Sequence, residues 1–498
     1  MNIVFAASES TPFIKTGGLA DVVGSLPHAL RSLGSEVCVI LPKYEDIPEN
    51  WKARMERITE FTISIGWRNQ YCGLQRVEVN GLVYYFIDNE FYFRRKGIYG
   101  YGDDAERFVF FSRAVAASLP HLDMQPDVVH CHDWQTALVP FCIKVHHQGQ
   151  PFYEKIRTVF TIHNLQYQGR FSKEWLQDLI GVGDDFFALD GLEFYGDGSC
   201  MKAGLFYADL LTTVSKTYAE EIQTPAYGEQ LDGVLRHRSN VLHGIVNGID
   251  NDSYDPMKDE ALYVPYRNSQ AKKQMNKVKL QQELGLPERV DVPMIGMVSR
   301  LVEQKGLDLI ECVLDEILRL DIQWVVLGTG DWRYEQLFRD AASCYPEKLA
   351  ALIQFDDAMS RKIYAASDLF LMPSRFEPCG LGQLIALRYR SAPIVRETGG
   401  LKDTVQAYNE FTGMGTGFSF ANFNAHDMLY TIERAVSFYH ERPELWSRLL
   451  KNISKTDYDW GQSAKKYLEL YQSLQLQTVN HHQAGSAMAG SAVVGSAV

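Results

Sequence analysis

The chain has 498 residues, which is too long for one hydrophobic core and indicates two large domains or three smaller ones. Its composition, 46% hydrophobic and 22% charged, is that of a globular protein and excludes a largely disordered or membrane-embedded chain. A net charge of −13 argues against nucleic acid as a partner, so the basic residues that matter are expected to be local.

No apolar run approaches the roughly 20 residues that a membrane span requires, and the N-terminus predicts a strand instead of a basic leader. We therefore expect a cytoplasmic protein without a membrane partner; a plastid location would require a transit peptide that has been removed. The eight cysteines lack Cys-x-x-Cys spacing, which argues against a zinc ribbon or disulfide framework and for a reducing compartment.

The first motif follows an apolar strand predicted at residues 3–7. The segment Lys15-Thr-Gly-Gly-Leu-Ala-Asp-Val22 leads from that strand into an amphipathic helix. Because Gly17 and Gly18 have no Cβ, an anion can approach their N–H groups closely, and the helix presents its positive end to the same ligand. Lys15 adds a full charge. The pattern predicts an anion-binding turn, and an ordinary strand-to-helix turn is the alternative.

The first half of the chain alternates apolar strands with helices, which is typical of a doubly wound parallel sheet. The further predicted strands are residues 37–41, 83–87, 128–130, 158–162 and 210–214, and the clearest helices are residues 106–118 and 135–146.

Two of these strands end in polar clusters, His130-Cys-His-Asp-Trp134 and His163-Asn164. Ligands bind outside the carboxyl ends of such strands, so we expect Asp133, His163 and Asn164 to face the same crevice as Lys15. Neighbouring residues on a strand point to opposite sides, which argues against a metal site at His-Cys-His-Asp.

The segment around residues 241–250 predicts a domain boundary, and a second alternating set begins after a charged helix at residues 268–284. Its predicted strands are residues 294–298, 324–327, 352–355, 369–372 and 392–395. We therefore divide the chain into an N-terminal Rossmann-like domain (1–243), a C-terminal one (244–456), a terminal helix returning to the first domain (457–476) and a disordered Ala/Gly/Ser tail (477–498).

Charged and glycine-rich loops follow several strands of the second domain. Arg300 and Lys305 after the first strand suit a diphosphate. Glu377 lies in the turn from Ser374 to Leu381, which leads into a helix predicted at residues 382–389. Thr398-Gly-Gly-Leu401 repeats the Gly-Gly pattern of the opening turn.

Together these motifs resemble the bacterial glycogen synthase and plant starch synthase family, from Asn2 to about Leu474. The likeness is carried by Lys15 to Val22, His132-Asp-Trp134, Thr161-Ile-His-Asn164, Asn247-Gly-Ile-Asp250, Ser299-Arg-Leu301 with Gln304-Lys-Gly306, Gly328-Thr-Gly-Asp331, Ser374 to Leu381, and Thr398-Gly-Gly-Leu401 with Asp403-Thr-Val405.

The resemblance implies an α/β GT-B architecture, with two Rossmann-like doubly wound domains facing across a deep cleft. It implies a retaining enzyme that transfers glucose from ADP-glucose to the non-reducing end of an α-1,4-glucan, with ADP as the other product and no metal or other cofactor. The alternatives are the same reaction with UDP-glucose and a catalytically silent glucan-binding or priming scaffold. A nicotinamide-dependent oxidoreductase is excluded, because no Gly-x-Gly-x-x-Gly turn follows the first strand.

The matching positions imply roles for individual residues. Arg300 and Lys305 would hold the departing diphosphate, Glu377 would support the glucosyl group, and Asp133 and His163 would orient the sugar. The implied catalytic residues are Lys15, Asp133, His163, Arg300, Lys305 and Glu377, and the implied binding residues are Lys15, Gly17, Gly18, Asn164, Arg300, Lys305, Gly380, Leu381 and Gly382.

Two of the positions that depart from the family pattern lie beside the donor motif of Ser374 to Leu381. Ile385 stands where many retaining GT-B enzymes carry a second glutamate that binds the ribose, so the ribose contact is unassigned. Gly382 stands where many synthases carry a threonine, which removes a hydroxyl that could reach the distal phosphate.

Overall fold

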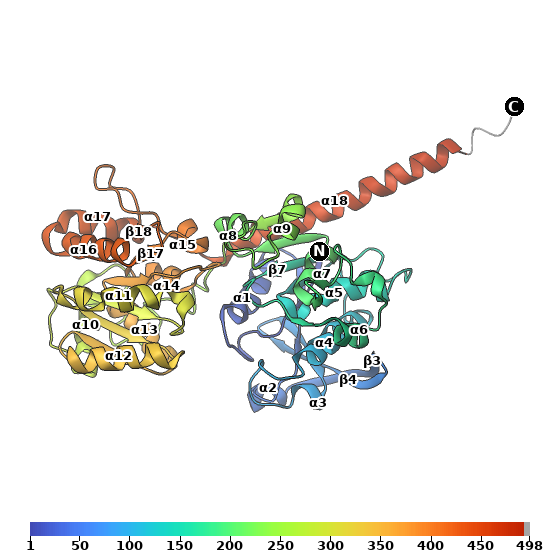
Figure 1. The fold of residues 1–498 in the computed structure, drawn as a ribbon, viewed down its shortest axis with the longest axis horizontal. Coiled ribbons are helices and arrows are strands. Elements are labelled where there is room, and N and C mark those ends of the chain that lie inside the picture. The colour runs from blue at the N-terminus through green and yellow to red at the C-terminus, as the bar shows by residue number, and fades with distance from the viewer. Residues whose placement is uncertain (493–498) are drawn as a thin grey trace. The chain divides into compact units, whose positions relative to one another are not determined.

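The computed structural model describes the backbone of residues 1–492 and the side chains of residues 1–476. The chain forms two compact units (Figure 1). The N-terminal unit contains residues 1–214, 219–245 and 460 onward, and the C-terminal unit contains residues 215–218 and 246–459. Within residues 1–492, no helix combines the length and apolarity that a bilayer crossing requires.

A nine-stranded sheet forms the centre of the N-terminal unit, in the order β12-β11-β7-β6-β1-β2-β5-β4-β3. Its strands are β1 (Asn2–Ala6), β2 (Glu36–Pro42), β3 (Glu56–Ile65), β4 (Arg68–Val79), β5 (Leu82–Asp88), β6 (Val128–His132), β7 (Arg157–Ile162), β11 (Leu210–Thr213) and β12 (Leu242–Gly244). A separate three-stranded sheet contains β8 (Arg170–Ser172), β9 (Glu193–Phe194) and β10 (Asp197–Ser199).

The strands from β12 to β5 are parallel, as the sequence predicts. The hairpin of β3 and β4 adds antiparallel pairs at one edge, which the expectation of a parallel sheet did not include. This hairpin has no buried apolar run that would identify it, because most side chains of β3 are exposed.

Helices flank this sheet and include one long C-terminal element. They are α1 (Gly18–Ser32), α2 (Glu49–Lys52), α3 (Glu90–Phe93), α4 (Asp104–Ser118), α5 (Leu138–Phe141), α6 (Lys173–Ile180), α7 (Cys200–Tyr207), α9 (Asp232–His237) and α18 (Trp460–Ala492). Helix α8 (Lys216–Glu221) has residues in both units. The helix predicted at residues 135–146 is broken into a 3-10 turn, α5 and a π-helical turn over Cys142–His146. Pro140 lies in this stretch and supplies no N–H for a continuous helix.

Helix α18 packs against α1 and continues past its predicted end at residue 476. The helix therefore includes residues 477–492 of the predicted disordered tail, a stretch that contains no proline to end it. Residues 493–498, the rest of that predicted tail, lie outside the described residues.

A six-stranded parallel sheet forms the centre of the C-terminal unit, in the order β15-β14-β13-β16-β17-β18. Its strands are β13 (Met294–Val298), β14 (Gln323–Leu327), β15 (Leu349–Leu352), β16 (Leu369–Met372), β17 (Ala392–Arg396) and β18 (Phe418–Phe420). In chain order this is 3-2-1-4-5-6, the order of a dinucleotide-binding Rossmann sheet, whose direction of winding reverses between β13 and β16.

The prediction of a strand at residues 352–355 is wrong in position, because β15 begins at Leu349 and ends at Leu352. It is an edge strand that pairs only with β14, and Phe355 beyond it is 86% exposed. The apolar side chain of Phe355 is therefore not evidence of a buried strand.

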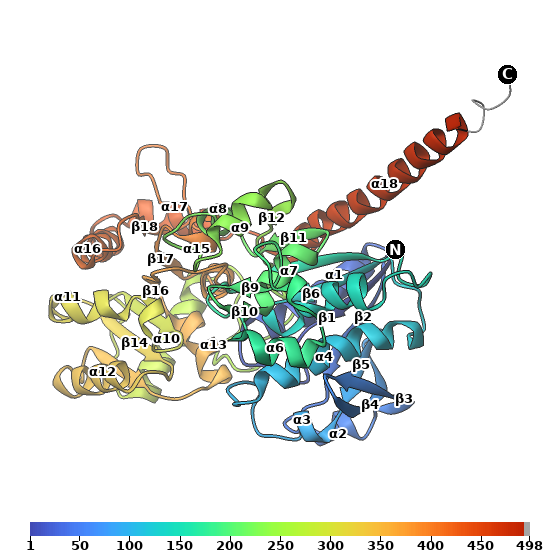
Figure 2. The ribbon, with the colours of Figure 1, turned by 45° about the vertical axis from the view of Figure 1, so that its right-hand side comes forward.

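Eight helices accompany this sheet: α10 (Gln270–Leu284), α11 (Leu307–Arg319), α12 (Trp332–Cys344), α13 (Asp357–Ala366), α14 (Gly382–Arg388), α15 (Gly399–Thr404), α16 (Ala425–Glu441) and α17 (Pro443–Ile453). Figure 2, like Figure 1, shows α10 and α13 side by side. Apolar side chains of α11, β14 and α16, including Ile310, Trp324 and Ile432, belong to one buried cluster.

Helix α10 is highly charged in sequence, yet two of its lysines are buried. The Nζ of Lys273 donates to the carbonyl oxygens of Ala365 and Tyr389, each at 2.9 Å. The Nζ of Lys277 lies 2.8 Å from the Oδ2 of Asp368, which also accepts a hydrogen bond from the N–H of Met294 at 3.0 Å. These contacts join α10 to β13 and to the start of β16.

We expect Asp368→Ala to destabilise the C-terminal unit by about 3–5 kcal/mol, because it leaves the Lys277 ammonium buried without its counter-charge. The measurement is native-state hydrogen exchange at the amides of β13 and β16. The matched control is Asp321→Ala, which breaks an exposed pair with Arg289 and should cost about 1 kcal/mol or less. Equal losses in the two variants would contradict the expectation.

Candidate active site

The turn after β1 holds a carboxylate of the chain itself. Glu9 is buried, and its Oε2 accepts hydrogen bonds from the N–H of Thr16 at 2.5 Å and of Gly17 at 3.3 Å. The Oγ1 of Thr16 donates to the same carboxylate at 3.0 Å. Loss of hydration raises the pKa of Glu9, and these hydrogen bonds oppose that rise.

Lys15 and Gly18 of the same turn are exposed, and the Nζ of Lys15 lies 2.8 Å from the Oδ1 of Asp21. A Cβ added at Gly17 would meet no other atom within 4 Å, so the fold itself does not demand glycine there. The open space beside Gly17 and the exposed Lys15 are compatible with anion binding at this turn. The anion-binding role of Lys15, Gly17 and Gly18 therefore stays a prediction. The structure adds that Glu9 already uses the N–H of Gly17.

Asp133 follows β6 and has an unusual backbone conformation, with φ of 56° and ψ of 179°. A side chain in this region costs about 1–3 kcal/mol and persists where its surroundings determine it. The Oδ1 of Asp133 accepts the N–H groups of His163 at 2.8 Å and Asn164 at 3.4 Å, which follow the neighbouring strand β7. The structure therefore brings together Asp133, His163 and Asn164, as the sequence predicts.

Loss of hydration raises the pKa of Asp133 to about 7, and the negative charge of Glu9 adds to the rise. Tyr99 is close to this pair, since its hydroxyl is 2.6 Å from the Oγ of Ser8 and 3.3 Å from Glu9. Sequence reasoning did not select Glu9. Its position could have identified it, because Glu9 is an acidic residue just beyond a buried strand, at the same sheet edge as Lys15.

In the C-terminal unit, Lys305 and Glu377 form an ion pair with Nζ and Oε2 2.6 Å apart. The Oγ of Ser374 donates to the same oxygen at 3.0 Å. A Cβ at Gly306 would lie 2.0 Å from the carbonyl oxygen of Pro373, so only glycine lets the Lys305 loop approach the Glu377 loop this closely. The exposed Arg300 guanidinium makes no ion pair with any described residue.

The second Gly-Gly segment has a packing role. The N–H of Gly400 donates to the carbonyl oxygens of Glu377 and Pro378, each at 3.1 Å, and a Cβ there would lie 2.1 Å from the carbonyl oxygen of Cys379. The repeat of the opening pattern is therefore a likeness of sequence only, because here the glycines support the turn that carries Glu377. Burial raises the pKa of the Cys379 thiol to about 12, as expected for a packed side chain.

Gly380 and Leu381 precede the seven-residue helix α14, which begins at Gly382. A Cβ at Gly382 would lie 3.2 Å from the Sδ of Met372, so part of the space for a threonine is already filled. Ile385 is buried in an apolar cluster with Phe370 and Leu384. In this structure the side chain of Ile385 therefore contributes to core packing.

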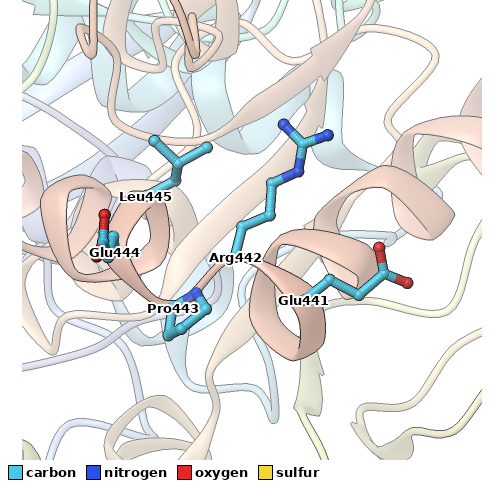
Figure 3. A pocket seen from close by; sticks show the side chains of 5 residues that line it. All are labelled: Glu441, Arg442, Pro443, Glu444 and Leu445. Carbon is cyan, nitrogen blue, oxygen red and sulfur yellow. The ribbon is translucent and has the colours of Figure 1, made fainter.

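No cluster of three or more His, Cys, Asp or Glu side chains among the described residues could hold a metal ion. An open pocket at the junction of α16 and α17 is lined by Glu441, Arg442, Pro443, Glu444 and Leu445 (Figure 3). Its two glutamates extend to different sides, and Arg442 pairs with Glu410. Because its charged groups do not converge, this pocket is not a candidate active site.

Comparison with known proteins finds a matching family model in each unit. A family model described as the starch synthase catalytic domain matches residues 2–237, and one described as glycosyl transferases group 1 matches residues 279–452. A glycogen synthase from Desulforamulus reducens is 57% identical over 475 residues, which is 95% of this chain and 99% of the relative. A glycogen synthase from Clostridium novyi is 55% identical, with 95% and 99% covered.

Among solved structures, the catalytic domain of starch synthase IV from Arabidopsis thaliana, bound to ADP and acarbose, superposes with a TM-score of 0.88. It is 34% identical to this chain, and the match covers 95% of this chain and 99% of the other.

We expect the Asp133 carboxyl to titrate near pH 7, and Glu9→Gln to lower this midpoint by removing a nearby negative charge. The measurement is ¹³C NMR of carboxyl-labelled aspartate, with the signal assigned by its loss in Asp133→Asn. The control is Asp178→Asn at the surface pair with Arg68, which should leave the midpoint unchanged. A midpoint below about pH 5 in the folded protein would contradict this expectation.

Proposed function

We propose that this chain, which belongs to the glycogen and starch synthase family, is a retaining glucosyltransferase that uses ADP-glucose to extend an α-1,4-glucan at its non-reducing end. Family membership makes it a glycosyltransferase of glucan synthesis with the GT-B fold, and it confirms the resemblance found in the sequence. The observation that carries the proposal is identity over nearly the whole of both chains, together with the paired Lys305 and Glu377.

The C-terminal unit would hold the donor's diphosphate. Breaking the bond between glucose C1 and the phosphate oxygen builds negative charge on the departing ADP and positive charge on the sugar. Arg300 and Lys305 would stabilise the first charge, and backbone N–H groups at Gly380, Leu381 and Gly382 would assist. Glu377, held by Ser374 and Lys305, would bind glucosyl hydroxyls and stabilise the positive centre.

The N-terminal unit would orient the sugar. Asp133, His163 and Asn164 already lie together at the ends of β6 and β7. His163 would contact the glucosyl group as a neutral imidazole, because loss of hydration lowers its pKa to about 3. Lys15 would add positive charge beside the turn of Gly17 and Gly18.

The proposed partners are ADP-glucose, ADP and a glycogen, starch or malto-oligosaccharide acceptor, in agreement with the ADP and acarbose bound to the Arabidopsis starch synthase IV. We propose no metal in the reaction, because Arg300 and Lys305 supply the positive charge that a diphosphate leaving group requires.

We expect the chain to transfer labelled glucose from ADP-glucose to glycogen without added metal, faster than from UDP-glucose, and to form α-linked products by ¹H NMR. Glu377→Ala and Lys305→Ala should each lower kcat by about 10²–10³-fold, since both remove charge stabilisation in the transition state.

The control is Arg339→Ala, which breaks an exposed helix pair with Glu335 and should leave kcat unchanged. Transfer from neither donor, with ADP still bound, would overturn the proposal in favour of a catalytically silent glucan-binding scaffold. Faster transfer from UDP-glucose would overturn the proposed donor alone.

A further inference from the structure

Three histidines form a stack within the N-terminal unit. His130 and His132 point to the same side of β6, with ring centroids 4.2 Å apart, and the His163 ring lies 5.2 Å from that of His132. Loss of hydration lowers the pKa of all three, so each imidazole is neutral near pH 7 and carries one N–H. Which ring nitrogen of each residue carries it depends on the hydrogen bonds of the stack.

The Nδ1 of His132 and the Nε2 of His163 are 2.9 Å apart, so one of them donates to the other. The Nε2 of His132 is buried and has no hydrogen-bond partner among the described residues. A buried N–H without an acceptor is rarer and more costly than a buried lone pair without a donor. His132 therefore carries its proton on Nδ1 and donates it to the Nε2 of His163.

We propose that His132 is a positioning residue that fixes His163 in the tautomer protonated on Nδ1, so that His163 offers an N–H donor to a sugar hydroxyl. The donor role toward the sugar rests on the proposed function, whereas the tautomer rests on the hydrogen bond alone. The Nδ1 of His163 makes no hydrogen bond with any described residue, so it is available to a ligand.

The far side of the stack is held by the C-terminal helix. The hydroxyl of Tyr471 on α18 lies 2.7 Å from the Nδ1 of His130, and the Nε2 of His130 lies 2.5 Å from the Oγ1 of Thr161. With both nitrogens engaged, the His130 ring is a fixed surface against which His132 packs. The orientation of His163 is therefore determined by the packing of β6, β7 and α18.

The first test reads the proton directly by NMR of the deuterated, full-length chain with ¹⁵N-labelled histidines. We expect one hydrogen-bonded proton with a one-bond coupling to the Nδ1 of His132 and a coupling across the hydrogen bond to the Nε2 of His163. His132→Asn and His163→Gln assign the two nitrogens. A proton bonded to the Nε2 of His163, or no shared proton, would overturn the inference, whether or not the protein transfers glucose.

The second test is a double-mutant cycle on glucosyl transfer. His132→Phe keeps an aromatic ring in the stack without a donor, and it should lower kcat by about tenfold, whereas His132→Asn keeps an amide donor and should recover most of that loss. In a His163→Ala background, His132→Phe should have no further effect.

Additive losses in the cycle would show that His132 acts independently of His163 and would overturn its positioning role. His237→Gln, at an exposed site on α9, is the matched histidine control and should not change kcat. An inactive wild-type chain would count against the proposed function alone, since the NMR result decides the tautomer independently.

Discussion

The parallel order of the strands is the constraint on which both candidate clusters depend. Among the parallel strands, each sheet reverses its direction of winding once, between β1 and β6 in the N-terminal unit and between β13 and β16 in the C-terminal unit. The connections on the two sides of such a point diverge, which leaves room at the carboxyl ends of those strands. Glu9 and Asp133 follow the first pair of strands, and Arg300 and Glu377 follow the second.

The two units stabilise the carboxylates of the candidate site by different means. In the N-terminal unit, Glu9 and Asp133 accept hydrogen bonds from backbone N–H groups, and the nearby imidazoles are neutral. In the C-terminal unit, Glu377 is paired with the ammonium of Lys305. In the N-terminal unit these N–H groups hold the carboxylates without a cation from the described residues in contact, whereas the ammonium of Lys305 suits a diphosphate. This difference matches the roles proposed for each unit.

Much of this arrangement was predictable from the sequence. Buried parallel strands appear as continuous apolar runs, so most strands of both sheets and the polar residues that follow them could be identified. Strand β3 was not predicted, because most of its side chains are exposed. Strand β15 was predicted at the wrong position, because it lies at an edge, where apolar residues do not mark burial. Hydrophobic patterns alone therefore do not locate such strands.

Contacts that depend on the folded backbone were not predictable. The positive φ of Asp133 has no signature in a non-glycine residue, and the hydrogen bond of Glu9 to Gly17 requires the turn to be closed. The packing of Gly400 against Cys379 shows that a sequence pattern can also mislead. A Gly-Gly pair has the same sequence whether its amides face a ligand or a neighbouring loop. The sequence motifs predicted where the loops lie, and the local geometry showed what their glycines contact.

The position of Tyr471 has a consequence for the order of folding during synthesis. The N-terminal unit begins at the first residue, but the hydroxyl that holds His130 comes from α18, after the whole C-terminal unit has been translated. Domains usually fold in the order in which they leave the ribosome. Here the first unit has to wait for nearly the entire chain before Tyr471 can bond to His130, and until then its helix α1 lacks the packing of α18.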